Sequence, residues 1–256
     1  MLDREVAEAF SAALEAKGGR VVMGASVARV ETEPGAADPV RVHLEGGQVV
    51  AADQLLYVQG RDPATGGLGL EGAGISLGKY GRIDVDHAGR TTRPDVMAVG
   101  DVVGPPGLAS AAAHQGRTAA ERLFGKAAGG RAGEAPDATA LWTLPEVAGV
   151  GLTEAEAASR GVDFVCGYGR FRDLPRGLMA GDLRGWAKLV VERSTLRILG
   201  AHIIGDSACD LIQHAVTLVR EGKTAAEIAE SGFSAVTFDN LYELAAQDAI
   251  ERAAKS

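Results

Sequence analysis

The sequence predicts an α/β fold followed by an α+β layer, and three observations support this fold class. Residues 91–125 read as a short strand, an acidic residue, a tight loop and an alanine-rich helix, which is typical of α/β sheets. Residues 126–140 are small, polar and rich in Gly, Ala and Pro, which is typical of a linker. From residue 141 onward, a hairpin and several helices follow in separate runs, as in an α+β layer.

The composition argues against several classes of partner. Hydrophobic residues make up 46% and charged residues 23% of the chain, which is ordinary for a globular protein. The net charge of −8 argues against nucleic acid or an anionic membrane surface, and no apolar run approaches the ~18 residues of a membrane span. The opening residues are charged rather than a signal peptide, so we expect a cytoplasmic protein. Cys166 and Cys209 form no metal-ligand pattern, which predicts two free thiols and no metal site.

The first sixty residues predict one helix and several short strands. Apolar residues recur at helical spacing over residues 3–17, with Asp3 as the N-cap and two glycines after the helix as its stop. Residues 55–58 are a continuous apolar run, which is expected of a strand buried on both faces. The other strands are expected over residues 21–23, 25–31, 40–44 and 48–51.

The middle of the chain holds the most informative stretch. A short turn and a strand pair are expected over residues 68–86, before a buried strand at residues 96–99 that ends at Gly100 and Asp101. A helix follows over residues 108–124. Ligands of open α/β sheets bind beyond the carboxyl ends of the strands. Asp101 is therefore placed to accept hydrogen bonds from a sugar-like hydroxyl chain, and the helix start offers amide N–H groups to an anion.

The C-terminal part predicts strands and helices in alternation. A strand precedes a helix that begins near Thr153, where Glu156 completes a capping box. The remaining elements are a strand over residues 163–172, a hairpin of residues 186–192 and 196–204, an amphipathic helix over 206–221, a short helix from 223 and a final helix over 241–254.

Residues 91–125 closely resemble the second flavin-binding motif of the FAD-dependent pyridine nucleotide-disulfide oxidoreductases, the family of dihydrolipoamide dehydrogenase and glutathione reductase. Within this family, the run AVGDVVGPPGLASAAAHQGRTAA is most similar to the soluble pyridine nucleotide transhydrogenases. The resemblance implies FAD and NAD(P) as cofactors. The FAD-binding residues that it implies are Gly100, Asp101, Leu108, Ala109 and Ser110.

The resemblance extends over nearly the whole chain. Residues 60–63 resemble the Gly-Arg-x-Pro segment between the nucleotide domains, and GWAKLVVE and ILGAHIIGDSACDLI resemble the C-terminal dimerisation domain, which implies a homodimer. The implied organisation is the C-terminal part of an NAD(P)-binding domain over residues 1–60, the C-terminal part of an FAD-binding domain over 61–130, a linker over 131–140 and a dimerisation domain over 141–256.

The first strand–turn–helix unit of a dinucleotide domain, with its G-x-G-x-x-G fingerprint, is not identified in the sequence. We therefore expect the C-terminal portion of a longer flavoprotein, from a truncated or misassigned start, which is inactive alone and binds FAD weakly or not at all. A missing N-terminal chain that carries the FAD and NAD(P) fingerprints is the further partner to expect.

Disulfide-reducing members of the family carry a His-Pro-Thr-x-x-Glu motif that supplies a general base. This chain has VTFDNLYEL instead, so Phe238 or, with a two-residue deletion, Asn240 stands where the histidine should be. Neither transfers a proton, so no catalytic residue is assigned, and the five histidines are interpreted as surface or strand residues. Hydride transfer between nicotinamide and flavin needs no such base, and transhydrogenation or quinone reduction therefore fits better than dithiol oxidation.

Two alternatives to a transhydrogenase-like fragment stay open. The first is a fragment of a flavin-dependent quinone or dihydrolipoamide-type reductase. The second is a non-catalytic dimerisation domain, or the second chain of a split enzyme.

Overall fold

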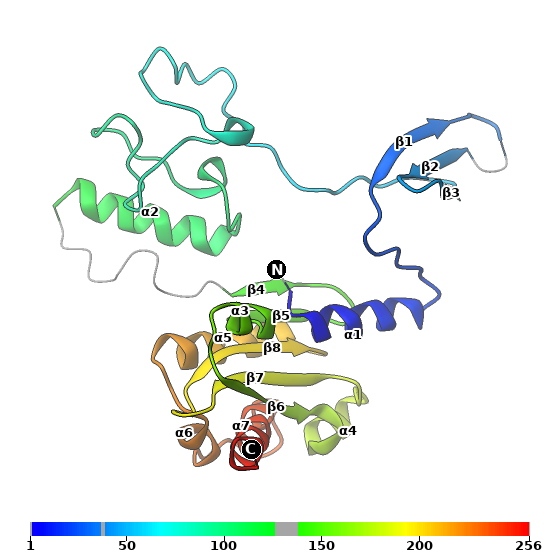
Figure 1. Ribbon diagram of the computed structural model, residues 1–256, viewed down its shortest axis with the longest axis vertical. Coiled ribbons are helices and arrows are strands. Elements are labelled where there is room, and N and C mark those ends of the chain that lie inside the picture. Colours follow the sequence, from blue (N-terminus) through cyan, green and yellow to red (C-terminus); the bar gives the residue numbers. More distant parts are fainter. Residues whose placement is uncertain (1, 37–38, 126–137, 256) are drawn as a thin grey trace. The chain divides into compact units, whose positions relative to one another are not determined.

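A computed structural model describes residues 2–36, 39–125 and 138–255 (Figure 1). The chain divides into two compact units, one of residues 14–62 and one of residues 1–13 together with 63–256. The expected linker over 131–140 lies mostly outside the described residues, and its last two residues belong to strand β4.

The unit of residues 14–62 is an antiparallel sheet in the order β1-β2-β3. The sheet has little core, because Val42 is the one apolar side chain that is buried among the described residues of this unit. The predicted strands at residues 21–23 and 55–58 do not form, and the prediction that residues 55–58 are buried is wrong. A strand buried on both faces needs neighbours on each side, and the described residues supply none. The strands are β1 (Val27–Thr32), β2 (Val40–Leu44) and β3 (Val49–Ala52).

Residues 63–125 contain one long helix, α2 (Ala109–Leu123), and two 3-10 turns, η1 (Lys79–Gly81) and η2 (Gly100–Val103). The helix confirms the prediction for residues 108–124. The expected strand at residues 96–99 is reduced to a single bridge between Met97 and Arg90, and the expected strand pair within 68–86 to a bridge between Leu77 and Ile83. Both predictions of extended strands are wrong, because these runs find no continuous sheet to join among the described residues.

Residues 138–255 form a five-stranded antiparallel sheet in the order β4-β5-β8-β7-β6. Helices α5 and α7 pack against one face of it, and the start of α1 packs with Val147 and Ile204 of the sheet. The predicted hairpin and amphipathic helix are confirmed as β7, β8 and α5. The elements are β4 (Thr139–Leu141), β5 (Val147–Gly151), α3 (Glu154–Ser159), β6 (Phe164–Arg170), η3 (Phe171–Asp173), α4 (Pro175–Ala180), β7 (Trp186–Glu192), β8 (Ile198–Ile204), α5 (Ala208–Arg220), α6 (Ala225–Ala229) and α7 (Asn240–Ala254), with α1 (Arg4–Glu15) at the start of the chain.

Local signals in the sequence set several of these boundaries. Asp3 accepts a hydrogen bond from the backbone N–H of Glu5 at 3.1 Å, as an N-cap does. The capping box predicted for Thr153 and Glu156 is present at the start of α3, and a second one opens α6. Glycines of β6 let α7 approach closely, because a Cβ atom at Gly167 would lie 2.6 Å from the Cβ atom of Ala249.

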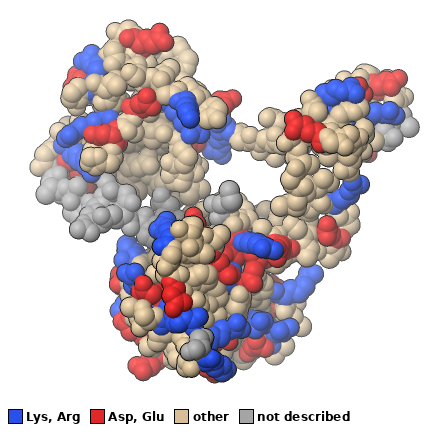
Figure 2. Space-filling model, viewed as in Figure 1, with Lys and Arg blue, Asp and Glu red and all other residues tan. Residues whose placement is uncertain are grey.

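The surface of the molecule is mixed in charge. Acidic and basic side chains are interspersed on the face shown in Figure 2, without a large patch of one sign. None of the helices in the described part of the chain has the length and apolar character that crossing a membrane requires. Both cysteines are free thiols, as predicted.

Candidate functional site

The loop that resembles the flavin motif is built around Gly100. Its φ of 80° is a left-handed conformation that glycine adopts without strain. A Cβ atom there would lie 3.3 Å from the Cβ atom of Ala112 on α2, so a side chain would crowd the helix. The N–H of Gly100 donates to Oε1 of Gln115 at 2.7 Å, which fastens the loop to α2.

The other residues of the predicted flavin site lie at the two ends of this loop. Asp101 is exposed in η2, which contacts α2. Leu108 is half-buried and precedes α2, whose first residues, Ala109 and Ser110, are exposed. Leu108, the residue before α2, makes no side-chain hydrogen bond to the first turn of the helix.

The spacing G-x-G-x-x-G does occur once, at residues 67–72. These residues form turns, with no strand before them and no helix after them in the described segment. The glycine fingerprint works because it joins a strand to a helix whose N-terminus faces the pyrophosphate. The spacing alone does not form a binding site for the diphosphate. The residues present are therefore compatible with the flavin end of FAD and not with its diphosphate.

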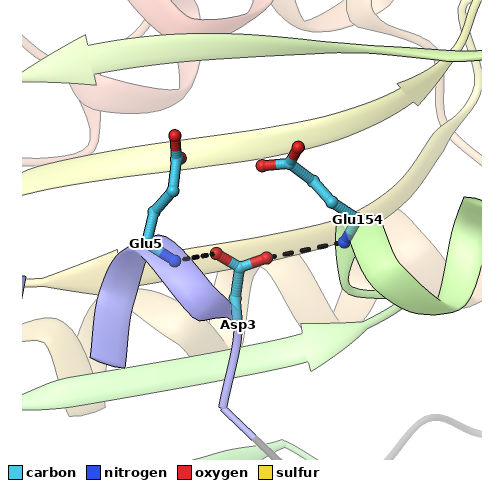
Figure 3. A group of neighbouring side chains, drawn as sticks. All are labelled: Asp3, Glu5 and Glu154. Carbon is cyan, nitrogen blue, oxygen red and sulfur yellow. Dashed lines mark hydrogen bonds between the residues drawn. The ribbon is translucent and has the colours of Figure 1, made fainter. Parts of the chain in front are cut away.

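A second cluster surrounds Lys188, a fully buried residue of β7. Its Nζ atom donates to Oδ1 of Asp3 at 2.6 Å and to Oε2 of Glu5 at 3.0 Å, and it also donates to Glu154. Figure 3 shows the three carboxylates converging from the start of α1 and from α3. Asp3 also accepts from the backbone N–H of Glu154 at 3.5 Å.

Lys188 and Asp3 stabilise each other's charged forms. Burial by itself lowers the pKa of Lys188, but the hydrogen bonds to the three carboxylates raise it above its ordinary value. Burial by itself raises the pKa of Asp3, yet the hydrogen bond and charge of Lys188, together with the charge of His202, lower it. Burial lowers the pKa of His202, and Lys188 lowers it further.

The three carboxylates are the one group in the described part of the chain that has the spacing of a metal site. The ammonium of Lys188 already donates to all three. A cation would have to displace it, so the cluster is an ion-pair network and not a metal centre.

The segment that aligns with the His-Pro-Thr motif lies beside a groove of about 440 Å³. Phe238 is buried and stacks on Phe171 with 4.3 Å between ring centroids, so it is a core residue. The imidazole in the groove belongs to His214 of α5, whose Nδ1 lies 3.8 Å from Oδ1 of Asp239. The sequence reading missed this pair, since the two residues are 25 positions apart.

Comparison with known proteins assigns the family. Residues 1–116 match the family described as "Pyridine nucleotide-disulphide oxidoreductase", and residues 138–246 match its dimerisation domain. The chain belongs to the pyridine nucleotide-disulphide oxidoreductase family. The predicted family and the predicted dimerisation domain are thereby confirmed.

Curated relatives match this chain over most of its length. The soluble pyridine nucleotide transhydrogenase of Pseudomonas putida is 33% identical over 254 residues, which are 98% of this chain and 54% of the relative. The transhydrogenase of Serratia proteamaculans is 37% identical over 222 residues, which are 85% of this chain and 47% of the relative. The chain thus spans about half the length of the curated relatives that it matches.

Two solved structures match most of the chain. LpdA from Mycobacterium tuberculosis matches with a TM-score of 0.86 at 28% identity, over 96% of this chain and 53% of that one. The flavoprotein disulfide reductase RclA from Escherichia coli matches with a TM-score of 0.84 at 27% identity, over 95% of this chain and 55% of that one. The mixed α/β fold class predicted from the sequence is therefore confirmed.

Proposed function

We propose that this chain is the C-terminal portion of a flavoprotein oxidoreductase that moves hydride between NAD(P)H and NAD(P)+ through FAD. The observation that carries the proposal is the similarity to soluble pyridine nucleotide transhydrogenases over 98% of the chain. The absence of a histidine at the His-Pro-Thr position agrees with it, because hydride transfer between nicotinamide and flavin requires orientation rather than a proton-transferring base.

The chain contributes one end of the proposed cofactor site. Bound FAD would supply a ring that can take up and release hydride, and the residues of this chain would hold and orient one end of it. Asp101 would accept hydrogen bonds from the hydroxyl chain, and the N–H groups at the start of α2 would face the ring. Gly100 would allow the close approach of loop and helix. The diphosphate and adenosine would be held by residues outside this chain.

We expect the chain alone to bind FAD weakly or not at all, and to catalyse no hydride transfer. A segment that supplies the glycine fingerprints, joined or co-expressed, should produce a yellow assembly with bound flavin and transhydrogenase activity. The measurement is flavin absorbance per chain after gel filtration, for the chain alone and for the assembly. Stoichiometric flavin on the isolated chain would contradict the expectation.

Replacing Asp101 with alanine in the flavin-loaded assembly should weaken FAD binding about tenfold to a hundredfold. A charge-assisted hydrogen bond contributes about 1.5–3 kcal/mol, which corresponds to that change in affinity. The melting temperature of the apo-protein should change much less than the flavin affinity, because the Asp101 side chain is exposed. Asp95→Ala, at an exposed carboxylate outside the proposed site, is the control. An unchanged flavin affinity in a folded Asp101→Ala variant would remove Asp101 from the site.

A second candidate function is that of a dimerisation domain without catalysis. It is favoured by the hydrophobic core within residues 138–255, where helices α5 and α7 pack against the five-stranded sheet. Large apolar side chains remain exposed on this domain, among them Trp142 at 80%, Leu144 at 74% and Met179 at 71%. Such side chains are suited to an interface between copies.

We expect the whole chain to form a homodimer through its dimerisation domain, residues 141–256. The apolar side chains left exposed on one copy would be covered by the second copy, which lowers the free energy of association. Analytical ultracentrifugation of the 256-residue chain at micromolar concentration measures the state directly, and the whole chain is used because Asp3 and Glu5 hold the buried Lys188 of this domain. A variant with Trp142→Ser and Leu144→Ser should be monomeric if these residues lie in the interface. A stable monomer of the unaltered chain would contradict the expectation.

A further inference from the structure

The two faces of the five-stranded sheet carry different side chains. Successive residues of a strand point to opposite faces. Ala187 and Ile203 belong to the main core, which α5 and α7 cover, whereas their neighbours Trp186 and Ile204 belong to a separate small cluster with residues of α1. Helix α1 therefore packs on the face opposite to α5 and α7, which we call the outer face.

A row of polar side chains crosses the outer face. Lys188 of β7 is paired directly with Tyr168 of β6 on one side and with His202 of β8 on the other. Directly paired residues of neighbouring strands point to the same face. Lys188 is 0% and His202 4% exposed, although a buried sheet face is normally lined by apolar side chains. This polar row, Tyr168, Lys188 and His202, distinguishes the outer face from the main core.

The first turn of α1 supplies the groups that complement the polar row. Asp3 and Glu5 accept hydrogen bonds from Nζ of Lys188 at 2.6 and 3.0 Å. Oε2 of Glu5 also accepts from the hydroxyl of Tyr168 at 2.8 Å. Val6 is 1% exposed and packs in the small apolar cluster beside these contacts. Helix α1 thus meets the outer face with two carboxylates and one buried apolar side chain.

The outer face would remain intact without α1. Glu154 of α3 also accepts a hydrogen bond from Lys188 and approaches it from within the C-terminal domain (Figure 3). A buried ammonium without any partner is costly, and Glu154 would still pair with Lys188 if α1 were absent. The main core contains no described residue of α1. Helix α1 can therefore leave the outer face without opening the main core.

The course of the chain gives this contact a mechanical consequence. Residues 14–62 form one compact unit, whereas residues 1–13 and 63–256 belong to the other. The chain therefore leaves the larger unit after residue 13 and returns to it at residue 63. While α1 is docked, the unit of residues 14–62 is attached to the larger unit at both of its ends. Release of α1 would leave the attachment at residue 63 alone.

We propose that the outer face is a docking site for an amphipathic helix with an acidic first turn, and that α1 fills it as a releasable strap. The strap binds and leaves as one unit while the main core stays folded. The polar row and the carboxylates of Asp3 and Glu5 hold it closed. In the docked state it restrains the unit of residues 14–62, and in the released state that unit reorients about a single attachment. Neither flavin nor nicotinamide takes part, so the strap is independent of the proposed function.

Hydrogen exchange of the whole 256-residue chain, followed by mass spectrometry, tests the release of α1. The conditions are chosen so that each exchange rate is proportional to the opening equilibrium. We expect the amides of α1 to exchange as a group and faster than those of β8, because release leaves the main core closed. Asp3→Ser should accelerate exchange in α1 about tenfold and leave β8 unchanged, since docking then buries Lys188 with one carboxylate fewer.

The controls separate charge from helix stability. Serine is a good N-cap, so Asp3→Ser removes the charge while it keeps the helix start. Glu8→Gln removes a carboxylate of the same helix that is 61% exposed, and should leave exchange in α1 nearly unchanged.

A second measurement tests the restraint on the unit of residues 14–62. Val6→Asp places a carboxylate against the buried Val147 and Ile204 and should release the strap. Nitrogen-15 relaxation then compares the rotational correlation time of the β1–β3 amides with that of the β7 and β8 amides. We expect the ratio of the two times to fall in Val6→Asp relative to the unaltered chain.

Three results would each overturn the proposal. Amides of α1 and β8 that exchange at one rate, or a Val6→Asp variant whose β7 and β8 amides lose their protection, would show that α1 belongs to the main core. Unchanged exchange in Asp3→Ser would show that the polar row does not hold the strap. An unchanged ratio of correlation times in a Val6→Asp variant with released α1 amides would show that the strap restrains nothing. Each result is obtained without flavin, so the proposed function stands or falls separately.

Discussion

Replacing Lys188 with methionine is expected to lower the free energy of unfolding by about 3–5 kcal/mol, the usual cost of removing one partner from a buried ion pair. Asp3 is 2% exposed and would be left without the ammonium that it contacts at 2.6 Å. Methionine keeps most of the volume, so the loss would report on charge rather than on a cavity. Urea denaturation followed by circular dichroism measures it.

Two controls define this result. Lys223→Met removes a lysine from an exposed pair with Glu227 and should leave the unfolding curve nearly unchanged, because solvent screens such pairs. Adding Asp3→Asn to Lys188→Met should recover part of the loss, since the uncompensated buried charge is then gone. A Lys188→Met variant as stable as the unaltered protein would show that the three carboxylates do not depend on Lys188.

Replacing Gly167 with alanine is expected to cost about 3 kcal/mol, at the upper end for overpacking in a core. The new Cβ atom would meet the backbone oxygen of Ala245 and would lie 2.5 Å from the backbone nitrogen of Ala249, so helix α7 would have to move away from β6. Backbone atoms of a packed helix cannot turn aside as a flexible side chain can. The measurement is the midpoint of thermal unfolding.

Gly232→Ala is the matched control for Gly167→Ala. Nothing lies within 4 Å of a Cβ atom at Gly232, so its replacement should leave the midpoint nearly unchanged. Equal melting temperatures for Gly167→Ala and Gly232→Ala would contradict this prediction. They would show that the close packing of α7 on β6 does not require glycine at position 167.

The C-terminal domain was predictable from the sequence because its signals are local. The capping box at Thr153, the hairpin of β7 and β8 and the helical spacing of α5 each depend on residues close together in the chain. The prediction of a strand at residues 55–58 was wrong because burial of a strand depends on distant neighbours. The apolar run has the composition of a buried parallel strand, but the described residues include no strands or helices that would cover it.

The two side-chain clusters were harder to predict, because they join distant segments. Lys188 meets Asp3 across 185 positions, and no periodicity relates the two. The available signal was a lysine inside the run Trp186–Val191, which is otherwise apolar, because a buried charge requires a partner. His214 was interpreted as a surface or strand residue, since only folding brings α5 beside the segment before α7.

The buried core and both tryptophans lie mainly in the C-terminal part of the chain, so tryptophan fluorescence monitors the unfolding of that part only. With the exception of Val6, the largest fully buried side chains belong to residues 138–255. The chain has two tryptophans, Trp142 and Trp186, and both lie in that same part. Intrinsic tryptophan emission therefore monitors the C-terminal sheet and carries no direct signal from residues 14–62. A single sharp fluorescence transition would consequently describe the melting of one domain, and would not demonstrate that the whole chain unfolds in one step.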